Sequence, residues 1–259
     1  MRLTLEGRFR NKKLIVFDLD GTLTPSKSRM RRDVSRLLSK LLVVNKVAVI
    51  GGGRYEQFKD QFLSAFRSPK KDLKNLFLFP TSSTSFYRYK NGWKKVYEKK
   101  LSPRERRKIF RGFERVFKEV GYKHPSRLYG RVIEDRGTQI TFSALGQEAS
   151  VRAKEEWNRK YDVRPKLMRA LKKYLPEFEI RRGGLTSIDV TKKGIDKAYG
   201  IRQIRKKLGV SIRDMLFVGD ALYPGGNDYA ARRTGVDCVS VSGPREAKKI
   251  IRFLIGGEI

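Results

Sequence analysis

Two aspartates near the start of the chain have the spacing that metal-assisted chemistry requires. Asp18 directly follows the apolar residues 14–17, and Asp20, two positions later, directly precedes a glycine. Residues i and i+2 of a strand point to the same side, so both carboxylates would project beyond the strand's carboxyl end. Ligands of open α/β sheets bind at that edge. Two carboxylates held close together repel each other unless a cation lies between them, and Mg²⁺, which prefers oxygen ligands, suits such a pair.

A second predicted strand ends in a loop with the composition of a phosphate-binding loop. The mostly apolar residues 46–50 lead into three glycines and an arginine, and a helix with an aromatic face follows. Backbone N–H groups of a glycine loop ahead of a helix can donate to phosphate oxygens. The residues of this loop that we expect to bind phosphate are Gly51, Gly52, Gly53 and Arg54.

A third strand end supplies another carboxylate, and a lysine comes shortly before it. The apolar residues 215–218 lead towards Asp220, and Lys197 opens the preceding helix. Brought to one sheet edge, these groups suit phosphoryl transfer, in which one carboxylate attacks phosphorus and a second carries the proton. Mg²⁺ held by Asp18, Asp20 and Asp220 would neutralise the approach of the anionic substrate. Lys197 would hold the phosphate oxygens.

The order of the predicted elements indicates an α/β core that is interrupted by a different module. Strands and helices alternate in the first third of the chain and again near its end, which favours a doubly wound, mostly parallel sheet. The middle of the chain has an antiparallel pattern instead and begins with a hairpin at Asn91-Gly92. We expect a core from residues 1–83 and 186–259, and an inserted α+β cap domain for substrate specificity from residues 84–185.

The composition indicates a folded protein with a high positive charge. Aromatic residues make up 11% of the chain, more than a disordered protein carries. The 60 Lys and Arg residues outnumber the 27 Asp and Glu residues, which gives a formal net charge of +33. Because the basic residues are spread through almost every segment, a nucleic-acid-binding protein on a scaffold suited to phosphoryl transfer is an alternative that we do not favour.

The sequence also bears on the compartment and on the partners of the protein. Its apolar runs are too short to span a bilayer, so we expect no membrane partner. The first residues lack the apolar core of a signal peptide, and the single cysteine, Cys238, cannot form an internal disulfide. These features fit a cytoplasmic monomer or homodimer.

The motifs resemble those of the haloacid dehalogenase superfamily of phosphatases and phosphomutases. They are Asp18-Leu19-Asp20-Gly21-Thr22, Asp196-Lys197, Gly219-Asp220 and Pro224-Gly225-Gly226-Asn227-Asp228. The inserted block resembles the type IIB cap of that superfamily, and residues 183–190 are most similar to eukaryotic-type phosphomannomutases. The resemblance covers nearly the whole chain. It implies a HAD-like fold, a phosphorylated sugar as substrate, and Asn227 as a further phosphate-binding residue.

The resemblance also implies a role for each matching residue of the core. Asp18 would be the nucleophile that forms an aspartyl-phosphate. Asp20 would be the general acid/base and would give its backbone carbonyl to Mg²⁺. Asp220 would be a metal ligand with Asp228 beside it, and Lys197 would bind the transferring phosphoryl group. The positions in and next to the inserted block that would hold the sugar and its distal phosphate are Arg136, Gln147, Ser187 and Asp189.

Two departures from the family's pattern bear on the reaction. The mutases carry an arginine where this chain has Gln147, and the next expected arginine is Lys154. They also carry a serine at the position of Gly53. A weaker clamp on the distal phosphate favours hydrolysis over mutase chemistry, which must hold a bisphosphorylated intermediate. We therefore expect a Mg²⁺-dependent sugar phosphatase, with phosphomannomutase activity as the alternative.

Overall fold

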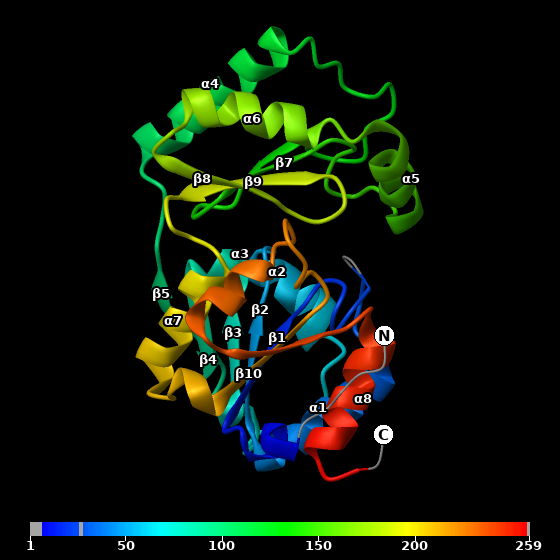
Figure 1. Cartoon of the computed structure of the whole chain (residues 1–259), viewed down its shortest axis with the longest axis vertical. Coiled ribbons are helices and arrows are strands. Elements are labelled where there is room, and N and C mark those ends of the chain that lie inside the picture. Colours follow the sequence, from blue (N-terminus) through cyan, green and yellow to red (C-terminus); the bar gives the residue numbers. More distant parts are fainter. Residues whose placement is uncertain (1–6, 26–27, 258–259) are drawn as a thin grey trace. The chain divides into compact units, whose positions relative to one another are not determined.

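The computed structural model describes residues 7–25 and 28–257, and its contacts divide the chain into two compact units. The core unit comprises Met1–Glu98 and Asp196–Ile259, and the inserted unit comprises Lys99–Ile195. Figure 1 labels the helices and strands of both units. The chain therefore leaves the core unit once and returns to it once.

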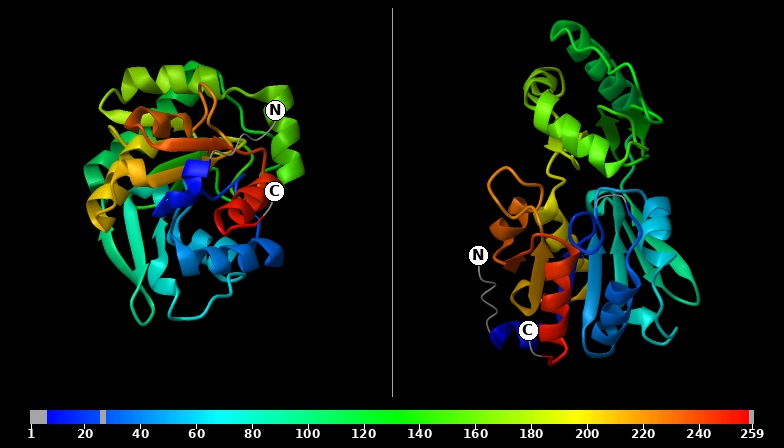
Figure 2. Two further views of the ribbon diagram at one scale, coloured as in Figure 1. Left: turned by 60° about the horizontal axis from the view of Figure 1, so that its bottom comes forward. Right: turned by 90° about the vertical axis from the view of Figure 1, so that its right-hand side faces the viewer.

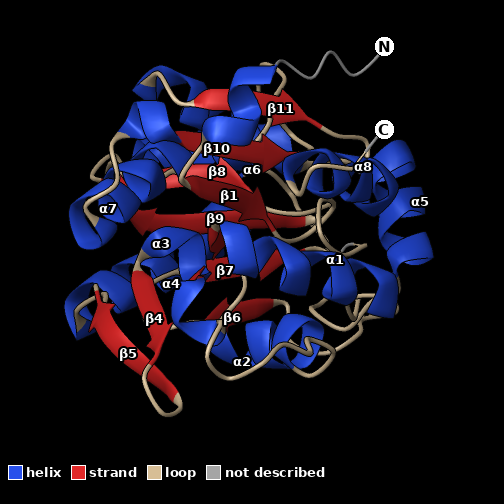
Figure 3. Cartoon of the chain, turned by 90° about the horizontal axis from the view of Figure 1, so that it is seen from below, coloured by secondary structure: helices blue, strands red, loops and turns tan. Residues whose placement is uncertain are grey.

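The core unit is built on a seven-stranded sheet with the order β11-β10-β1-β2-β3-β4-β5. Figure 3 labels β11, β10, β1, β4 and β5 of this sheet. At its centre, β1 (Leu14–Asp18) pairs in parallel with β2 (Lys46–Ile50) and β10 (Met215–Gly219). The parallel part continues with β3 (Leu76–Phe79) beside β2 and β11 (Asp237–Ser240) beside β10. Every residue of β1 is buried, as a strand covered on both faces requires. The doubly wound α/β fold expected from the sequence is confirmed.

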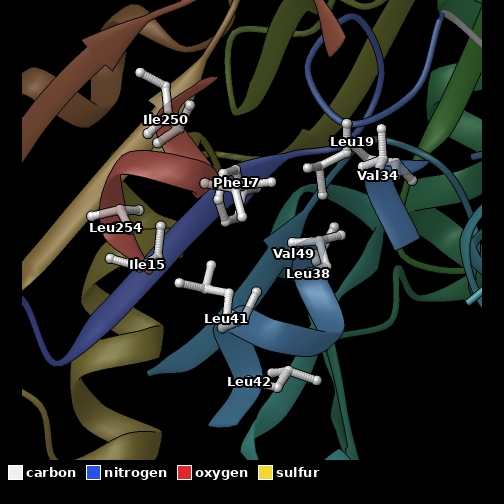
Figure 4. Close-up of a cluster of buried hydrophobic side chains, with 14 of the residues drawn as sticks. Ile15, Phe17, Leu19, Val34, Leu38, Leu41, Leu42, Val49, Ile250 and Leu254 are labelled. Atoms are coloured by element: carbon white, nitrogen blue, oxygen red, sulfur yellow. The ribbon is translucent and has the colours of Figure 1, made fainter. Parts of the chain in front are cut away.

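Helices cover both faces of this sheet. The side chains of each strand alternate between the two faces, and in residues 14–17 of β1 both sets of side chains are apolar and buried. On one face, Phe17 packs among apolar residues of α1 (Arg32–Val44) and α8 (Pro244–Leu254), as Figure 4 shows. These two helices lie side by side in both views of Figure 2. On the other face, Val16 packs against apolar residues of α7 (Lys197–Leu208). The two faces together bury the strand whose end carries Asp18.

The predicted hairpin at Asn91-Gly92 forms, but it extends the main sheet. Strand β4 (Ser85–Tyr89) pairs antiparallel with β3, and β5 (Trp93–Glu98) pairs with β4. The expected core boundary after residue 83 therefore differs from the observed one at Glu98. The backbone hydrogen bonds of the hairpin join it to the core.

The inserted unit has a separate antiparallel sheet of four strands with the order β6-β7-β9-β8. These strands are β6 (Ile133–Asp135), β7 (Ile140–Ser143), β8 (Phe178–Arg182) and β9 (Ser187–Lys192). Strand β9 falls within the range expected for the core, yet it pairs with β7 on one side and β8 on the other. The return to the core unit therefore comes at Asp196.

Helices α4 (Pro103–Glu119) and α6 (Arg164–Tyr174) lie side by side over one face of this second sheet (Figure 1). A capping box starts α4: the Ser102 hydroxyl accepts from the Glu105 N–H at 3.2 Å, and the Glu105 carboxylate accepts from the Ser102 N–H at 2.6 Å. Apolar residues of both helices pack on the strands beneath them. The opposite face of the sheet is left for polar side chains.

The remaining helical segments are shorter, except for α5. They are α2 (Tyr55–Phe58), a π-helical turn (Lys59–Leu63), α3 (Pro80–Ser83), α5 (Val151–Tyr161), and 3-10 turns at Gly7–Asn11, Leu73–Asn75, Ile212–Asp214 and Tyr229–Thr234. Within the part of the chain that the structure describes, no helix has both the length and the apolar character that crossing a membrane requires.

Candidate active site

Three aspartates meet at the carboxyl ends of two neighbouring strands. Asp18 is the last residue of β1, and Asp220 directly follows β10, its parallel neighbour. Asp228 comes from the loop after β10. Two hydrogen bonds hold it there: its N–H donates to the Ala221 carbonyl, and its Oδ2 accepts from the Ala221 N–H, each at 3.2 Å. Carboxylate oxygens of Asp18, Asp220 and Asp228 lie within 4.8 Å of one another.

Lys197, the first residue of α7, brings a positive charge into this cluster. The preceding residue, Asp196, caps the helix with a side chain that accepts from the Tyr199 N–H at 2.7 Å. The Lys197 Nζ donates to Oδ1 of Asp18 and lies 3.0 Å from Oδ1 of Asp228. The lysine and both carboxylates are buried. The N-cap at Asp196 thus fixes the end of α7 that places the Lys197 ammonium group in the cluster.

The carboxylates of this cluster outnumber its ammonium group by three to one. Burial raises the pKa of Asp18 well above its usual value; Lys197 opposes this effect, while Asp228 and Asp220 add to it. Burial and the charge of Asp228 raise the pKa of Asp220 to about 6. A divalent cation bound by these oxygens would offset the two remaining negative charges, so the residues present fit Mg²⁺.

The backbone beside the cluster approaches the carboxylates closely. A β-carbon at Gly21 would lie 2.5 Å from Oδ2 of Asp220, and one at Gly219 would lie 2.3 Å from Oδ2 of Asp228. Gly21 also has a φ of +86°. The Thr22 hydroxyl donates to Oδ1 of Asp220 at 3.2 Å. Glycine at both positions is therefore a condition for the observed placement of the two carboxylates.

Asp20, the expected acid/base, follows β1 but does not belong to the group of three carboxylates. It lies in a turn in which the Leu19 carbonyl accepts from the N–H groups of Leu23 and Thr24, both at 3.0 Å. The Gly21 N–H donates to the Thr24 carbonyl at 2.7 Å. These bonds hold Asp20 just beyond the strand end. The metal contact expected of Asp20 uses its backbone carbonyl, which requires no place in the carboxylate cluster.

The glycine loop follows β2 as expected, but its first amide is already engaged. The Gly51 N–H donates to the Phe79 carbonyl at 3.3 Å, which contradicts its expected contact with phosphate. The carbonyls of Gly51 and Gly53 accept from the N–H groups of Ser82 and Thr81 at 2.9 and 2.8 Å. Phosphate binding stays a prediction for Gly52, Gly53, Arg54 and, in the loop after β10, the exposed Asn227.

The segment that holds this loop was not identified from the sequence. Thr81, Ser82 and Ser83 follow β3 with φ angles of 48°, 55° and 64°. Consecutive non-glycine residues in the left-handed region are strained, and such strain is typical of functional sites. The Ser83 carbonyl accepts from the Tyr97 hydroxyl at 2.8 Å, and the Ser83 hydroxyl is buried without a partner. In the sequence, Pro80 and the small polar residues after it predict a turn, but they do not predict the left-handed backbone.

Two expected substrate residues lie on the polar face of the sheet in the inserted unit. Glu134, Thr141 and Asp189 are direct neighbours across β6, β7 and β9. The Thr141 hydroxyl donates to Oδ1 of Asp189 at 2.7 Å. Ser187 lies two residues before Asp189, hence on the same face, and is opposite Ser143. The sheet therefore aligns hydroxyl and carboxylate groups on this face.

The other two expected substrate residues contact each other. Nη2 of Arg136 donates to Oε1 of Gln147 at 3.2 Å, and Nε of Arg136 donates to the Glu134 carboxylate at 2.8 Å. The side chains of Arg136 and Glu134 are 6% and 14% exposed. Lys154 is buried, and its Nζ donates to the Gln147 carbonyl at 3.2 Å. The Arg136 guanidinium thus already has an anionic partner within the inserted unit.

The doubly wound sheet and its acidic strand ends define the class of the protein. Enzymes of the haloacid dehalogenase type combine such a core with an inserted unit, and here that unit is α+β. Residues 34–256 match the family model described as eukaryotic phosphomannomutase. The chain belongs to the eukaryotic phosphomannomutase family.

Individual relatives cover most of the chain. The phosphomannomutase of Encephalitozoon cuniculi is 30% identical over 250 residues, which are 90% of this chain and 90% of the relative. The phosphomannomutase of Saccharomyces cerevisiae is 28% identical over 226 residues, 83% of each chain. The names of these relatives favour a phosphomutase over the hydrolase expected from the sequence.

Solved structures of lower identity share the fold. The IMP-bound, N-terminally truncated IMP-nucleotidase of Plasmodium falciparum superposes with a TM-score of 0.69 at 17% identity, over 95% of this chain and 68% of that chain. The trehalose-6-phosphate phosphatase of Aspergillus fumigatus has a TM-score of 0.55 at 17% identity, over 96% of both chains. At these identities the likeness concerns the fold alone.

Proposed function

We propose that the protein is a Mg²⁺-dependent phosphomutase that acts on a hexose phosphate through an aspartyl-phosphate at Asp18. The observation that carries this proposal is the buried cluster in which Asp18, Asp220 and Asp228 share the ammonium group of Lys197. Membership of the phosphomannomutase family supports a sugar phosphate as substrate. The names of the relatives support transfer of the phosphoryl group back to the sugar rather than to water.

In the proposed reaction, a carboxylate oxygen of Asp18 attacks phosphorus while the bond from phosphorus to the sugar oxygen breaks. Asp20 gives its proton to the leaving oxygen, and later removes a proton from the sugar hydroxyl that accepts the phosphoryl group. Lys197 binds phosphoryl oxygens with the ammonium group that contacts Asp18. Asp18, Asp220 and the backbone carbonyl of Asp20 would hold Mg²⁺, supported by Asp228, and the ion would supply neutralising charge.

The inserted unit would bind the part of the substrate that does not react. Ser187 and Asp189 present a hydroxyl and a carboxylate on the polar sheet face, and such groups can hydrogen-bond to sugar hydroxyls. Arg136 can bind a distal phosphate through its planar guanidinium. This assignment gives the inserted unit, Lys99–Ile195, the role of a substrate-specificity domain.

Hydrolysis is a second candidate, and the surroundings of Arg136 favour it. Glu134 neutralises the guanidinium. The resemblance to the mutases predicts arginines at the positions of Gln147 and Lys154, and neither residue offers a second guanidinium. A distal phosphate would have to compete with Glu134 for Arg136. Weak retention of the sugar monophosphate beside the phospho-aspartate would let water take the phosphoryl group before a sugar hydroxyl does.

Product analysis with mannose 1-phosphate separates the two reactions. We expect mannose 6-phosphate when Mg²⁺ and a hexose bisphosphate are added, whereas free phosphate as the main product would show a hydrolase. Asp18→Asn should abolish both products, and the exposed Asp60→Asn is the matched control that should retain them. Full activity of Asp18→Asn would contradict the assigned nucleophile.

A further inference from the structure

One side of helix α4 carries a row of four exposed arginines. Arg104, Arg107, Arg111 and Arg115 are spaced by three, four and four residues. At 3.6 residues per turn, this spacing places them within an arc of about 80° on the helix surface. The apolar residues Ile109, Phe113 and Val116 are buried on the other side of the helix. We refer to these four residues as the arginine row.

The charges of the arginine row are not neutralised within the described chain. None of the four guanidinium groups forms an ion pair with a residue in 7–25 or 28–257, whereas neighbouring cations do. Arg106 pairs with Asp135 at 3.2 Å, and Lys108 pairs with Glu177. Like charges three or four residues apart on a helix repel each other. An external anion along the row would remove this repulsion.

The row borders a groove between α4 and α6. A cavity of 480 Å³ is lined by the arginine row together with Lys108, Gly112 and Tyr174. Gly112 lets the helices approach, because a β-carbon there would lie 2.9 Å from Cδ1 of Leu175. Tyr174, at the end of α6, is 37% exposed. The groove thus combines an accessible aromatic ring with guanidinium groups that form no ion pair with the described residues, and Figure 1 shows the two helices that form it.

The dimensions of the row indicate a ligand with many phosphates. From Arg104 to Arg115 the helix rises by about 16 Å, more than a single phosphate group can span. Guanidinium groups bind phosphate oxygens in pairs, so a row of four suits a chain that carries one phosphate per unit. The ring of Tyr174 can stack on a base, and unpaired bases are available for stacking only in single strands. We propose that the arginine row and Tyr174 bind the backbone of a single-stranded nucleic acid.

Fluorescence anisotropy with a labelled single strand of about 12 nucleotides tests this proposal on the full chain, because such binding sites span roughly 4 to 16 nucleotides. Replacing all four residues of the row by glutamine should weaken binding at least thirtyfold, as estimated from four lost phosphate contacts. It should also lower the slope of log affinity against log salt by about 3, since each contact to a single strand contributes roughly 0.7. Circular dichroism should be unchanged. If the quadruple variant does not fold, the single variants Arg107→Gln and Arg111→Gln should each weaken binding about threefold.

A second quadruple variant separates the row from the overall charge. Arg36→Gln, Arg202→Gln, Arg205→Gln and Lys206→Gln remove the same charge from exposed helix positions of the core unit. We expect this variant to bind within about twofold of the wild-type protein, since it retains all four contacts of the row. Equal weakening by both quadruple variants would overturn the proposal, because binding would then follow net charge alone.

Tyr174 and competing polyanions complete the test. Tyr174→Leu should weaken binding of the single strand about tenfold through loss of stacking, while Tyr174→Phe should retain it. A duplex of the same length should bind at least tenfold more weakly than the single strand, because its bases are not available to the ring. Binding of the duplex, or of phosphatidylserine vesicles, as tightly as the single strand would show a general polyanion surface and would overturn the proposal.

Discussion

Gly21 and Asp220 lie so close together that a β-carbon on Gly21 would be 2.5 Å from Oδ2 of Asp220. We therefore expect Gly21→Ala to displace the Asp220 carboxylate from the cluster it forms with Asp18 and Asp228. Loss of one of three carboxylate ligands should weaken Mg²⁺ binding at least tenfold. Isothermal titration of the purified variant with Mg²⁺ measures this change.

The control for Gly21→Ala is Gly235→Ala. Gly235 has a similar φ of +78°, but nothing lies within 4 Å of the β-carbon that alanine would add. Both variants carry the cost of a left-handed alanine, about 1 kcal/mol in the free energy of unfolding, and only Gly21→Ala should lose Mg²⁺ affinity. Equal Mg²⁺ affinities of the two variants would show that the contact with Asp220 does not matter.

Removing the ammonium group of Lys197 should impair catalysis and increase the dependence on metal. Lys197→Met leaves three buried carboxylates without their lysine partner, so we expect kcat/KM to fall by about a hundredfold or more. Added Mg²⁺ should raise the Tm of this variant more than that of the wild-type protein, because the ion replaces lost positive charge. The exposed Lys193→Met is the control and should change neither quantity.

The left-handed segment after β3 offers a stabilising substitution. Ser83 has a φ of 64°, and its hydroxyl is buried without a partner. Ser83→Gly removes both costs and should raise the free energy of unfolding by about 1 kcal/mol, as measured by urea denaturation. Ser83→Ala removes only the hydroxyl and should give a smaller gain. A larger gain from alanine than from glycine would show that the backbone at this position is not strained.

Acid should weaken the inserted unit through Asp162. Burial alone would raise the pKa of this carboxyl, but hydrogen bonds and attraction from Arg164, together with the charge of Arg182, lower it below its usual value. A lowered folded-state pKa stabilises the protein above the unfolded value of about 3.9, and this contribution disappears as the pH falls through the folded value. Asp162→Asn should therefore reduce Tm at pH 7 and have little effect near pH 2.

The partner of Arg136 should influence the fate of the phosphoryl group. Gln147 accepts a hydrogen bond from Arg136, and the resemblance to the mutases predicts an arginine at its position. Gln147→Arg adds a cation beside Glu134, which should free Arg136 for a distal phosphate. We expect the ratio of mannose 6-phosphate to free phosphate to rise severalfold in the product assay. Gln147→Lys supplies the charge without the planar fork, so its effect should be smaller.

Much of the core and its acidic site could be predicted because the signals are local. The buried strands β1 and β10 are apolar runs, and parallel strands place their carboxyl ends at one edge, so Asp18 and Asp220 had to lie near each other. The position of Lys197 could not be predicted from a local signal, since it depends on how α7 packs against the sheet. Here the resemblance to a known family supplied what spacing alone did not.

The remaining features depend on partners that are distant in sequence. The Asn91-Gly92 turn predicts a hairpin, but a turn does not reveal which sheet edge the hairpin joins. The apolar residues Ile188 and Val190 of β9 would suit either sheet equally well. The pairing of Arg136 with Glu134 and the engagement of the Gly51 amide likewise arise from tertiary contacts. The strained backbone of Thr81 to Ser83 contains no residue type that favours a positive φ.

The strand order of the core sheet also determines when the site can form during synthesis. Strand β1 pairs with β10, and the hydrogen-bonded side chains of Thr22 and Asp220 are 198 positions apart. At roughly 5 to 20 residues per second, a ribosome needs about 10 to 40 seconds to add that length. The inserted unit comes from one continuous stretch and can complete its own sheet in this interval. A nascent chain can therefore assemble the carboxylate cluster only after β10 and the loop that carries Asp228 have been synthesised.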